Sequence, residues 1–254
     1  MIPIKKGSDI DGMKKSCRAA SEILDHLAAM VQPGTTTGEL DAEAARLIKE
    51  RGGKSPFFGY RGFPGHICAS VNDEVVHGIG GLRQLTYGDI IKLDVGILLD
   101  GWVGDTAMTV PVGAVSAEIS KLLQETEVAL YLGIENARAG QRLGDVCSAI
   151  EKHVTKSGYS VVREFVGHGV GRSLHEEPQI PNFGKAGTGP LLKSGMTLAI
   201  EPMVNMGKCD VKILKDGWTV VTRDSKPSSH FEHTVLVTEG DPEILTCRKV
   251  HAYR

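Results

Sequence analysis

The sequence predicts a mixed α/β fold of the α+β type, built from two similar halves. The first observation is an internal repeat, in which PGTTTGELDAEAARLIKERG (33–52) aligns with AGQRLGDVCSAIEKHVTKSG (139–158) and glycines coincide at three positions. The second is a pair of strand-like segments, GDIIKLD (88–94) and GMTLAIE (195–201), which both end on a carboxylate. The third is size, because 254 residues with 41% hydrophobic side chains can bury a full-sized core.

Each half is expected to start with two helices and to continue into antiparallel strands. Long helical patterns at 8–31 and 116–138 precede the two repeat segments. Each repeat segment has the signature of a turn, an N-capped helix and a glycine stop, and strand-like segments follow it. A site is expected where the strand ends of the two halves converge. These patterns predict one domain over residues 1–254, with halves at approximately 8–112 and 116–240.

A hairpin is predicted around Asp100 and Gly101, which lie between two apolar runs. Asp-Gly in this setting is the strongest short-range signal for a two-residue turn. With that turn, Asp94 pairs with Ala107, two residues along the strand from Asp105. Asp94 and Asp105 then share one face of the hairpin as diagonal neighbours about 7–8 Å apart, so their carboxylates can converge.

Two carboxylates of the second half are expected to join this pair. Glu201 ends the equivalent strand, and Glu232 opens another strand-like run in SSHFEHTVLVT. A single acid at a strand end is commonly just exposed, whereas acids at equivalent places in two repeats favour a shared site. Four carboxylates this close need strongly shifted pKa values or neutralising cations. Two divalent ions would balance their charge, and such metal pairs activate water in hydrolytic enzymes.

Three interpretations of the segment VGHGVGRSLHEEP (166–178) are compared with its residue spacing. A phosphate loop requires G-x-G-x-x-G, and here the glycines stand one residue short of that spacing. A zinc helix requires H-E-x-x-H, and Gln179 stands where the second histidine would be. The third reading makes His168 a nitrogen ligand and leaves His175 to donate a hydrogen bond to an oxyanion, provided that the glycines between them bend the chain. A lone histidine is more often structural, and the four acids favour this third reading.

Composition excludes several classes of function. The net charge is −2 and no run of basic residues occurs, so neither a nucleic-acid footprint nor a membrane-binding patch is indicated. We expect a cytoplasmic protein because the N-terminus lacks a signal-peptide pattern and no apolar run approaches membrane length. The five cysteines are scattered, which is typical of reduced thiols and not of a structural zinc site.

Seven short motifs occur in order between residues 70 and 234, namely SVNDEVVHG, KLDVG, GDTA, GHGVG, LHEEP, AIEP and FEHT. In these motifs the chain resembles the type I methionine aminopeptidases, and the similarity covers nearly the whole chain. The resemblance implies the pita-bread fold, with two pseudo-symmetric halves around a curved antiparallel sheet, in the bacterial form without an N-terminal extension. It also implies a centre for two divalent metal ions, with Co, Mn, Fe, Zn and Ni as candidates. The ligands would be Asp94, Asp105, His168, Glu201 and Glu232.

The same resemblance implies roles for individual side chains. His77 would contact the substrate near the scissile amide, and His175 would stabilise the carbonyl oxygen. Glu201 would shuttle a proton while metal-activated water attacks the carbonyl carbon. The aromatic segment FFGYRGF (57–63) would line a pocket for the methionine side chain, although such a cluster taken alone is more often core. The pocket residues would be Phe57, Tyr60, Phe63, Cys68 and Trp218.

Three departures from the family pattern leave every implied ligand in place. Gly80 and Gly81 stand where a proline is common, Leu174 stands where a larger residue is frequent, and His230 replaces an amide or similar side chain. These changes bear on the rigidity of a loop, the width of the pocket and the surroundings of Glu232.

The expected function is a metallo-aminopeptidase that removes the initiator methionine when the second residue is small. Its partners would be nascent polypeptide N-termini at the ribosome, with no nucleic acid bound directly, no membrane, and a monomeric chain. The nearest alternative is an Xaa-Pro aminopeptidase or prolidase of the same fold, which would share all five ligands. A second alternative is a non-catalytic adaptor of the same fold, against which the retention of all seven motifs argues.

Overall fold

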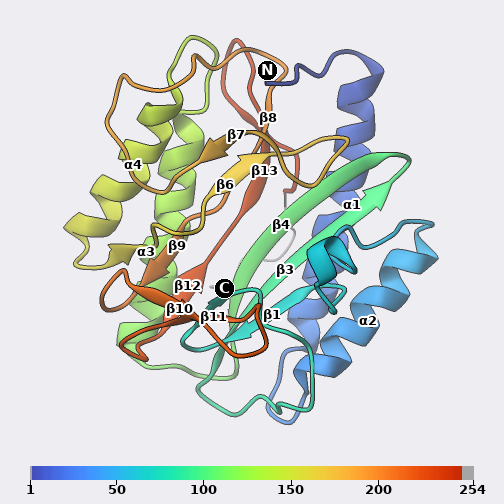
Figure 1. Cartoon of the computed structure of the whole chain (residues 1–254), viewed down its shortest axis with the longest axis vertical. Coiled ribbons are helices and arrows are strands. Elements are labelled where there is room, and N and C mark those ends of the chain that lie inside the picture. The colour runs from blue at the N-terminus through green and yellow to red at the C-terminus, as the bar shows by residue number, and fades with distance from the viewer. Residues whose placement is uncertain (1, 248–254) are drawn as a thin grey trace.

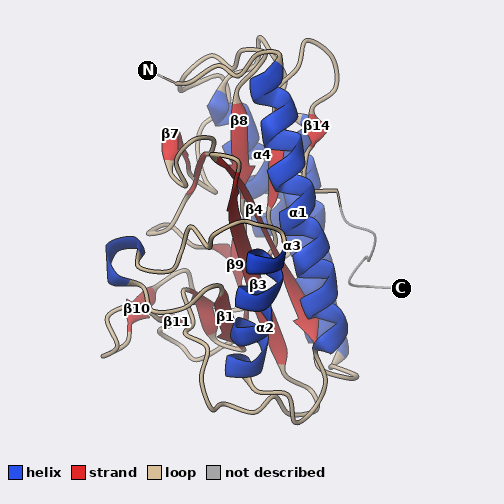
Figure 2. Cartoon of the chain, turned by 90° about the vertical axis from the view of Figure 1, so that its right-hand side faces the viewer, coloured by secondary structure: helices blue, strands red, loops and turns tan. Residues whose placement is uncertain are grey.

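The computed structural model describes residues 2–247 and shows the expected sequence of elements in each half (Figure 1). The helical patterns at 8–31, 33–52, 116–138 and 139–158 are all confirmed as helices. In Figure 1 the first pair lies on the right of the strands and the second pair on the left. Figure 2 shows that the helices cover one face of the strand layer, while long loops lie on the other. The helices are α1 (Ser8–Met30), α2 (Thr37–Glu50), α3 (Ala117–Glu135) and α4 (Leu143–Lys156).

The two repeat helices, α2 and α4, end by the same local chemistry and share one of two capping hydrogen bonds at their start. At α2 the Thr36 hydroxyl accepts from the Glu39 amide, and the Glu39 carboxylate accepts from the Thr36 amide at 2.7 Å. Arg142 offers no acceptor at the start of α4, and there the Asp145 carboxylate alone accepts from the Arg142 amide, at 2.9 Å. The glycines that follow the two helices have φ angles of 73° and 87°, the left-handed conformation that stops a helix.

Two glycines matched by the repeat have matched packing. A Cβ on Gly38 would lie 2.8 Å from the Gly81 carbonyl oxygen, and one on Gly144 would overlap the Lys185 carbonyl oxygen. Each helix therefore starts against the backbone of a loop in its own half, with no room for a side chain. The two glycines therefore match in the repeat because the same kind of close helix–loop contact occurs in both halves.

The strands of the first half carry the predicted hairpin. Its register is confirmed, because Asp94 pairs with Ala107 and Gly96 with Asp105. Asp100 and Gly101 form the turn with φ angles of 51° and 79°, as a type I′ turn requires. The elements of this half are the short helix η1 (Tyr60–Gly62) and the strands β1 (Cys68–Val71), β2 (Glu74–Val76), β3 (Ile90–Leu99) and β4 (Trp102–Pro111).

Within residues 2–247, ten further strands follow the first half, and their described pairs are all antiparallel. Its largest sheet has the order β14-β13-β8-β6-β7. Pro178 lies within the edge strand β7, and it is tolerated there because an edge strand has one side free of ladder bonds. The strands are β5 (Ser160–Val161), β6 (Gly167–Gly169), β7 (Glu176–Ile180), β8 (Thr197–Ile200), β9 (Met203–Asn205), β10 (Val211–Ile213), β11 (Val220–Thr222), β12 (Ser228–His230), β13 (His233–Leu236) and β14 (Glu243–Ile244).

Threonine side chains join the two halves along strand β4. The Thr106 hydroxyl donates to the Glu232 carbonyl at 2.9 Å, and the Thr234 hydroxyl donates to the Asp105 carbonyl at 2.8 Å. The Glu232 amide also donates to the Ala107 carbonyl at 2.9 Å. These bonds replace a regular strand ladder and place Asp105 of the first half beside Glu232 of the second.

We propose that the two halves form one domain, because a single cluster of buried apolar side chains draws on both. It includes Leu24 of α1 and Ile150 of α4, each fully buried, together with the inward faces of β3 and β8. Burial of one such side chain contributes roughly 1.5–3 kcal/mol. No helix within residues 2–247 combines the length and the apolar character required to span a bilayer.

Candidate active site

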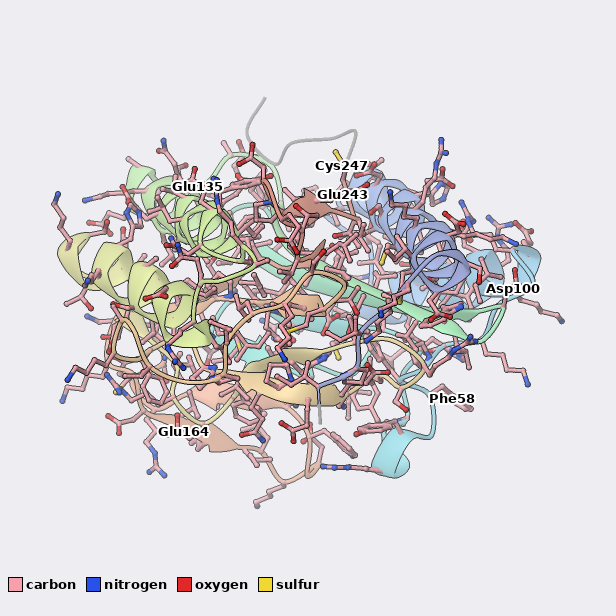
Figure 3. All side chains as sticks on the ribbon, turned by 90° about the horizontal axis from the view of Figure 1, so that it is seen from above. Phe58, Asp100, Glu135, Glu164, Glu243 and Cys247 are labelled. Carbon is pink, nitrogen blue, oxygen red and sulfur yellow. The ribbon has the colours of Figure 1, made fainter. Side chains whose placement is uncertain are left out.

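The predicted acidic and histidine residues line one cavity of about 550 Å³. The cavity wall also includes Glu164, which lies with Phe58 on the side of the strand layer away from the helices (Figure 3). Glu135, Glu243 and Cys247 lie on the opposite side in the same view. The helices thus support the strands from behind, and the strand ends and loops form the cavity in front.

Asp105, His168 and Glu232 come closest to a metal-binding arrangement. Each offers one ligand atom, and these three atoms all lie within 4.8 Å of one another. All three side chains are buried. Their positions follow from local pairing, because His168 of β6 pairs with Ala199 of β8, and Glu232 immediately precedes β13 on the other side of β8. The structure thus brings together Asp105 and Glu232, which are more than one hundred positions apart in the sequence.

Glu201 and Asp94 lie beside this group of three without belonging to it. The Glu201 Oε1 atom is 3.5 Å from His168 Nε2, and the Asp105 Oδ2 atom is 3.7 Å from the same nitrogen. Asp94 shares the cavity wall and the hairpin face with Asp105, as predicted. Asp94 and Asp105 each have a buried carboxylate oxygen, Oδ1, without a hydrogen-bond partner among residues 2–247. A bound cation would satisfy both oxygens.

Burial dominates the electrostatics of the acids. Desolvation raises the pKa of Asp94 to about 7 and that of Glu201 to about 8. Desolvation, reinforced by the charges of Asp94 and Glu201, also holds the pKa of Asp105 well above its usual range. Such a cluster of carboxyl groups does not ionise fully without a cation, whereas a nearby positive charge stabilises the ionised carboxylates. The donor set therefore fits a divalent metal.

His168 is prepared to act as a neutral nitrogen ligand. Burial lowers its pKa to about 3, with a smaller contribution from His175, so the imidazole carries no charge at neutral pH. Its Nδ1 lies 2.9 Å from the Gly169 carbonyl oxygen, which can only accept, so Nδ1 carries the proton. The Nε2 lone pair then faces the carboxylates, which is the usual arrangement of a metal-binding histidine.

His175 reaches the same cavity from the loop that joins β6 to β7. Its ring centroid lies 4.4 Å from that of His168, so the chain reverses between the two histidines, as one shared pocket requires. The intervening Gly169 and Gly171 serve close packing and not a left-handed turn, because an added Cβ at either would overlap neighbouring atoms. The Tyr60 hydroxyl lies 2.8 Å from His175 Nδ1. A phenol that donates to Nδ1 leaves the ring proton on Nε2, from which it can be donated to a substrate oxygen.

His77 stands at the end of β2 in a left-handed conformation, with a φ of 60°. Burial is the main cause that lowers its pKa to about 4. Its ring packs nearly perpendicular to that of Phe165 at a centroid distance of 5.4 Å and to that of Trp218 at 6.3 Å. A backbone conformation this unfavourable for a bulky residue is commonly retained where function needs it.

The residues predicted for the substrate pocket line the same cavity. Phe63 and Trp218 pack edge to face at 5.2 Å, and Phe57 is nearly fully buried. Phe58, in contrast, is 57% exposed and stacks on His66, outside the cavity wall. The predicted pocket residues found in the wall are Phe57, Tyr60, Phe63, Cys68 and Trp218.

Phe165 and Arg61 are among the cavity residues that the sequence analysis did not assign to the site. Phe165 packs on His77, and its only signal in the sequence was its place shortly before the glycine-rich segment. Arg61 lines the cavity with a φ of 50° and lies over the Tyr60 ring at 5.3 Å. His230, noted as a departure, places Nε2 3.4 Å from Glu201 Oε2 and is 1% exposed.

The fold and the site together define a metal-dependent hydrolase, and comparison with known proteins agrees. The model of metallopeptidase family M24 matches residues 11–239, and this chain belongs to that family. Methionine aminopeptidase 1 of Bacillus subtilis is 50% identical over 246 residues, covering 97% of this chain and 99% of the relative.

Solved structures show the same arrangement. The methionine aminopeptidase of Rickettsia prowazekii superposes with a TM-score of 0.96 at 42% identity, over 97% of this chain and all of that one. The prolidase of Pyrococcus horikoshii superposes with a TM-score of 0.80 at 21% identity, over 98% of this chain and 65% of that one. The second likeness shows the pita-bread fold alone, whereas the first extends to the whole chain.

Proposed function

We propose that this chain is a metal-dependent aminopeptidase that removes the initiator methionine from proteins whose second residue is small. The observation that carries the proposal is a single cavity in which a buried acidic and histidine cluster meets an apolar aromatic pocket. The cluster provides for hydrolysis, and the pocket provides for recognition of one unbranched apolar side chain. Relatives that match nearly the whole length of both chains are named methionine aminopeptidases.

The metal centre is proposed to hold two divalent ions, with cobalt, manganese, iron, zinc or nickel as candidates. Oxygen-rich ligation with one imidazole suits these metals better than it suits a thiolate-preferring ion. When bound, the metals lower the pKa of water and polarise the peptide carbonyl. The residues that would hold them are Asp94, Asp105, His168, Glu201 and Glu232.

The chain's own side chains provide positioning and proton transfer. His175 would donate a hydrogen bond from Nε2 to the carbonyl oxygen as negative charge develops there, an interaction that strengthens in the transition state. Glu201 would accept a proton from the attacking water and pass it to the leaving amine. His77 would contact the substrate near the scissile amide.

Methionine is the proposed occupant of the aromatic pocket. Phe57, Phe63 and Trp218 offer polarizable ring surface, which suits a flexible thioether. Burial of that side chain contributes roughly 1.5–3 kcal/mol to binding. One methylene of misfit changes selectivity only about 10–200-fold, so the preference is expected to be strong without being absolute.

The partners and the location are proposed from the same chemistry. The substrates would be nascent polypeptide N-termini at the ribosome, reached by a monomeric chain in the cytoplasm. A net charge of −2 gives no support to direct binding of nucleic acid or of an anionic membrane.

The test compares two tripeptides with purified protein in added Mn²⁺ or Co²⁺. We expect release of methionine from Met-Ala-Ser and negligible cleavage of Ala-Pro-Ala. The matched control is Glu201→Gln, whose metal content is measured alongside its activity. Preferred cleavage of Ala-Pro-Ala would replace the proposal with the proline-specific alternative. Full activity of Glu201→Gln with the metals retained would remove Glu201 from the proton pathway.

A further inference from the structure

The N-terminal segment lies against the loop that carries His175. Within this segment Lys5 is 4% exposed, and its Nζ donates to Glu176 Oε2 at 2.6 Å. The Lys5 amide also donates to the Gly195 carbonyl at 2.7 Å, in the turn that precedes β8. One residue near the start of the chain therefore contacts both the His175 loop and the approach to the strand that Glu201 follows.

Glu176, the residue after His175, organises the loop from within. Its Oε1 atom accepts from the Arg172 amide at 2.8 Å and from the Ser173 amide at 3.4 Å. A Cβ on Gly171 would lie 2.5 Å from Glu176 Oε1 and 2.7 Å from Lys5 Cε, so the loop closes tightly around the ion pair. The Arg172 and Ser173 amides thus donate to one oxygen of the Glu176 carboxylate, and Lys5 donates to the other.

A second set of contacts holds the part of the loop around Arg172. The Arg172 guanidinium lies 3.7 Å from the centroid of the Trp102 ring and donates to the Gly101 carbonyl at 3.3 Å. The Val103 amide donates to the Gly171 carbonyl at 2.8 Å. These contacts fix the loop to the β3–β4 hairpin, whereas the Lys5 pair reaches Glu176, the residue next to His175.

We propose that Lys5 is a positioning residue for His175, acting through its largely buried ion pair with Glu176. The inference rests on the proposed function, because it assigns His175 to the reaction. A buried carboxylate that loses its partner is driven toward water. Rotation of Glu176 would then release the Arg172 and Ser173 amides and shift His175. A misplacement of about 1 Å can cost on the order of 10²-fold in rate.

The first experiment compares Lys5→Met with Lys5→Arg and with the control Lys6→Met, which alters an exposed neighbouring lysine. On Met-Ala-Ser we expect kcat of Lys5→Met to fall about tenfold or more while KM changes less than about twofold, because His175 acts in the transition state. Lys5→Arg should recover most of the activity, since it keeps the charge, and Lys6→Met should match the wild type. Hydrogen exchange at the Arg172 and Ser173 amides should accelerate in Lys5→Met alone.

The decisive experiment is a double-mutant cycle with His175→Ala. If Lys5 acts through His175, Lys5→Met should cost less than about twofold in the His175→Ala background. Val154→Ala, in a buried position of α4, serves as a control for lowered stability, and all assays are run well below every Tm. Equal losses in both backgrounds, or the same loss in Val154→Ala, would overturn the positioning role. A wild type inactive on Met-Ala-Ser would overturn the proposed function. In that case, unchanged hydrogen exchange at the Arg172 and Ser173 amides in Lys5→Met would also show that the Lys5–Glu176 ion pair does not hold the loop.

Discussion

Removal of the metals should leave a protein that becomes less stable as the pH rises, and Asp94→Asn should reverse much of that loss. Burial raises the pKa of Asp94 from its ordinary 3.8 to about 7 in the folded chain. An acid whose folded pKa is raised binds its proton more tightly in the folded state. Ionisation of Asp94 therefore has little effect on the free energy of unfolding near pH 4 and lowers it by the full amount above pH 7.

The magnitude follows from the size of that rise. At about 1.4 kcal/mol for each tenfold change in proton affinity, it corresponds to about 4 kcal/mol at pH 8. The raised pKa of Glu201, about 8, acts in the same direction between pH 4.5 and 8. Asparagine keeps the shape of the Asp94 side chain and carries no charge, so the metal-free variant should gain up to about 4 kcal/mol at pH 8 and little at pH 4.

The assay is urea unfolding of chelator-treated wild type and Asp94→Asn at pH 4 and pH 8, followed by the same series with Mn²⁺ present. Metal should stabilise the wild type far more than the variant, because the variant lacks one ligand charge. Equal stability of the two metal-free proteins at pH 8 would show that Asp94 is not strained by burial, and the electrostatic account of the metal centre would then be wrong.

Three further outcomes are expected. Tyr60→Phe, which loses the hydrogen bond to His175, should lower kcat about fivefold, from about 1 kcal/mol for one hydrogen bond, and an unchanged kcat in steady-state assays would count against the tautomer argument. His230→Leu should weaken metal binding about 10–100-fold in chelator competition, whereas His230→Gln should stay near the wild type because a donor remains; equal affinities for all three proteins would remove His230 from the support of the centre. Gly144→Ala should lower the free energy of unfolding by about 1–3 kcal/mol because its Cβ has no space, and Gly240→Ala, where the space is open, is the control that should stay near zero.

Several parts of the fold could be predicted because they depend on neighbours in sequence. The Asp100-Gly101 turn sets the register of its hairpin within a few residues, and that register placed Asp94 and Asp105 on one face before any tertiary contact was known. The helix pairs follow from periodicity, caps and glycine stops in the same way. The resemblance in the seven motifs supplied the roles of His77 and the pocket residues, which spacing alone did not indicate.

Other parts of the site escaped prediction because the contacts that create them are distant in sequence. Phe165 has no periodic or turn signal that links it to His77, although their rings are 5.4 Å apart. Arg61 lies within the aromatic segment, where no spacing or motif marks it. It lines the cavity from η1, in which it has a left-handed backbone conformation. The linkage between Lys5 and Glu176 joins positions 171 residues apart.

The sequence by itself therefore determined the local units of this protein: its paired helices, its central hairpin, and the kinds of side chain that could bind metal. Only the tertiary structure decided how close Glu232 lies to Asp105, how deeply the acids are buried, and what holds His175 in place. The physical reason is that turns, caps and registers are set by short-range sterics and hydrogen bonds. Desolvation and convergence, in contrast, depend on which distant strands pack together.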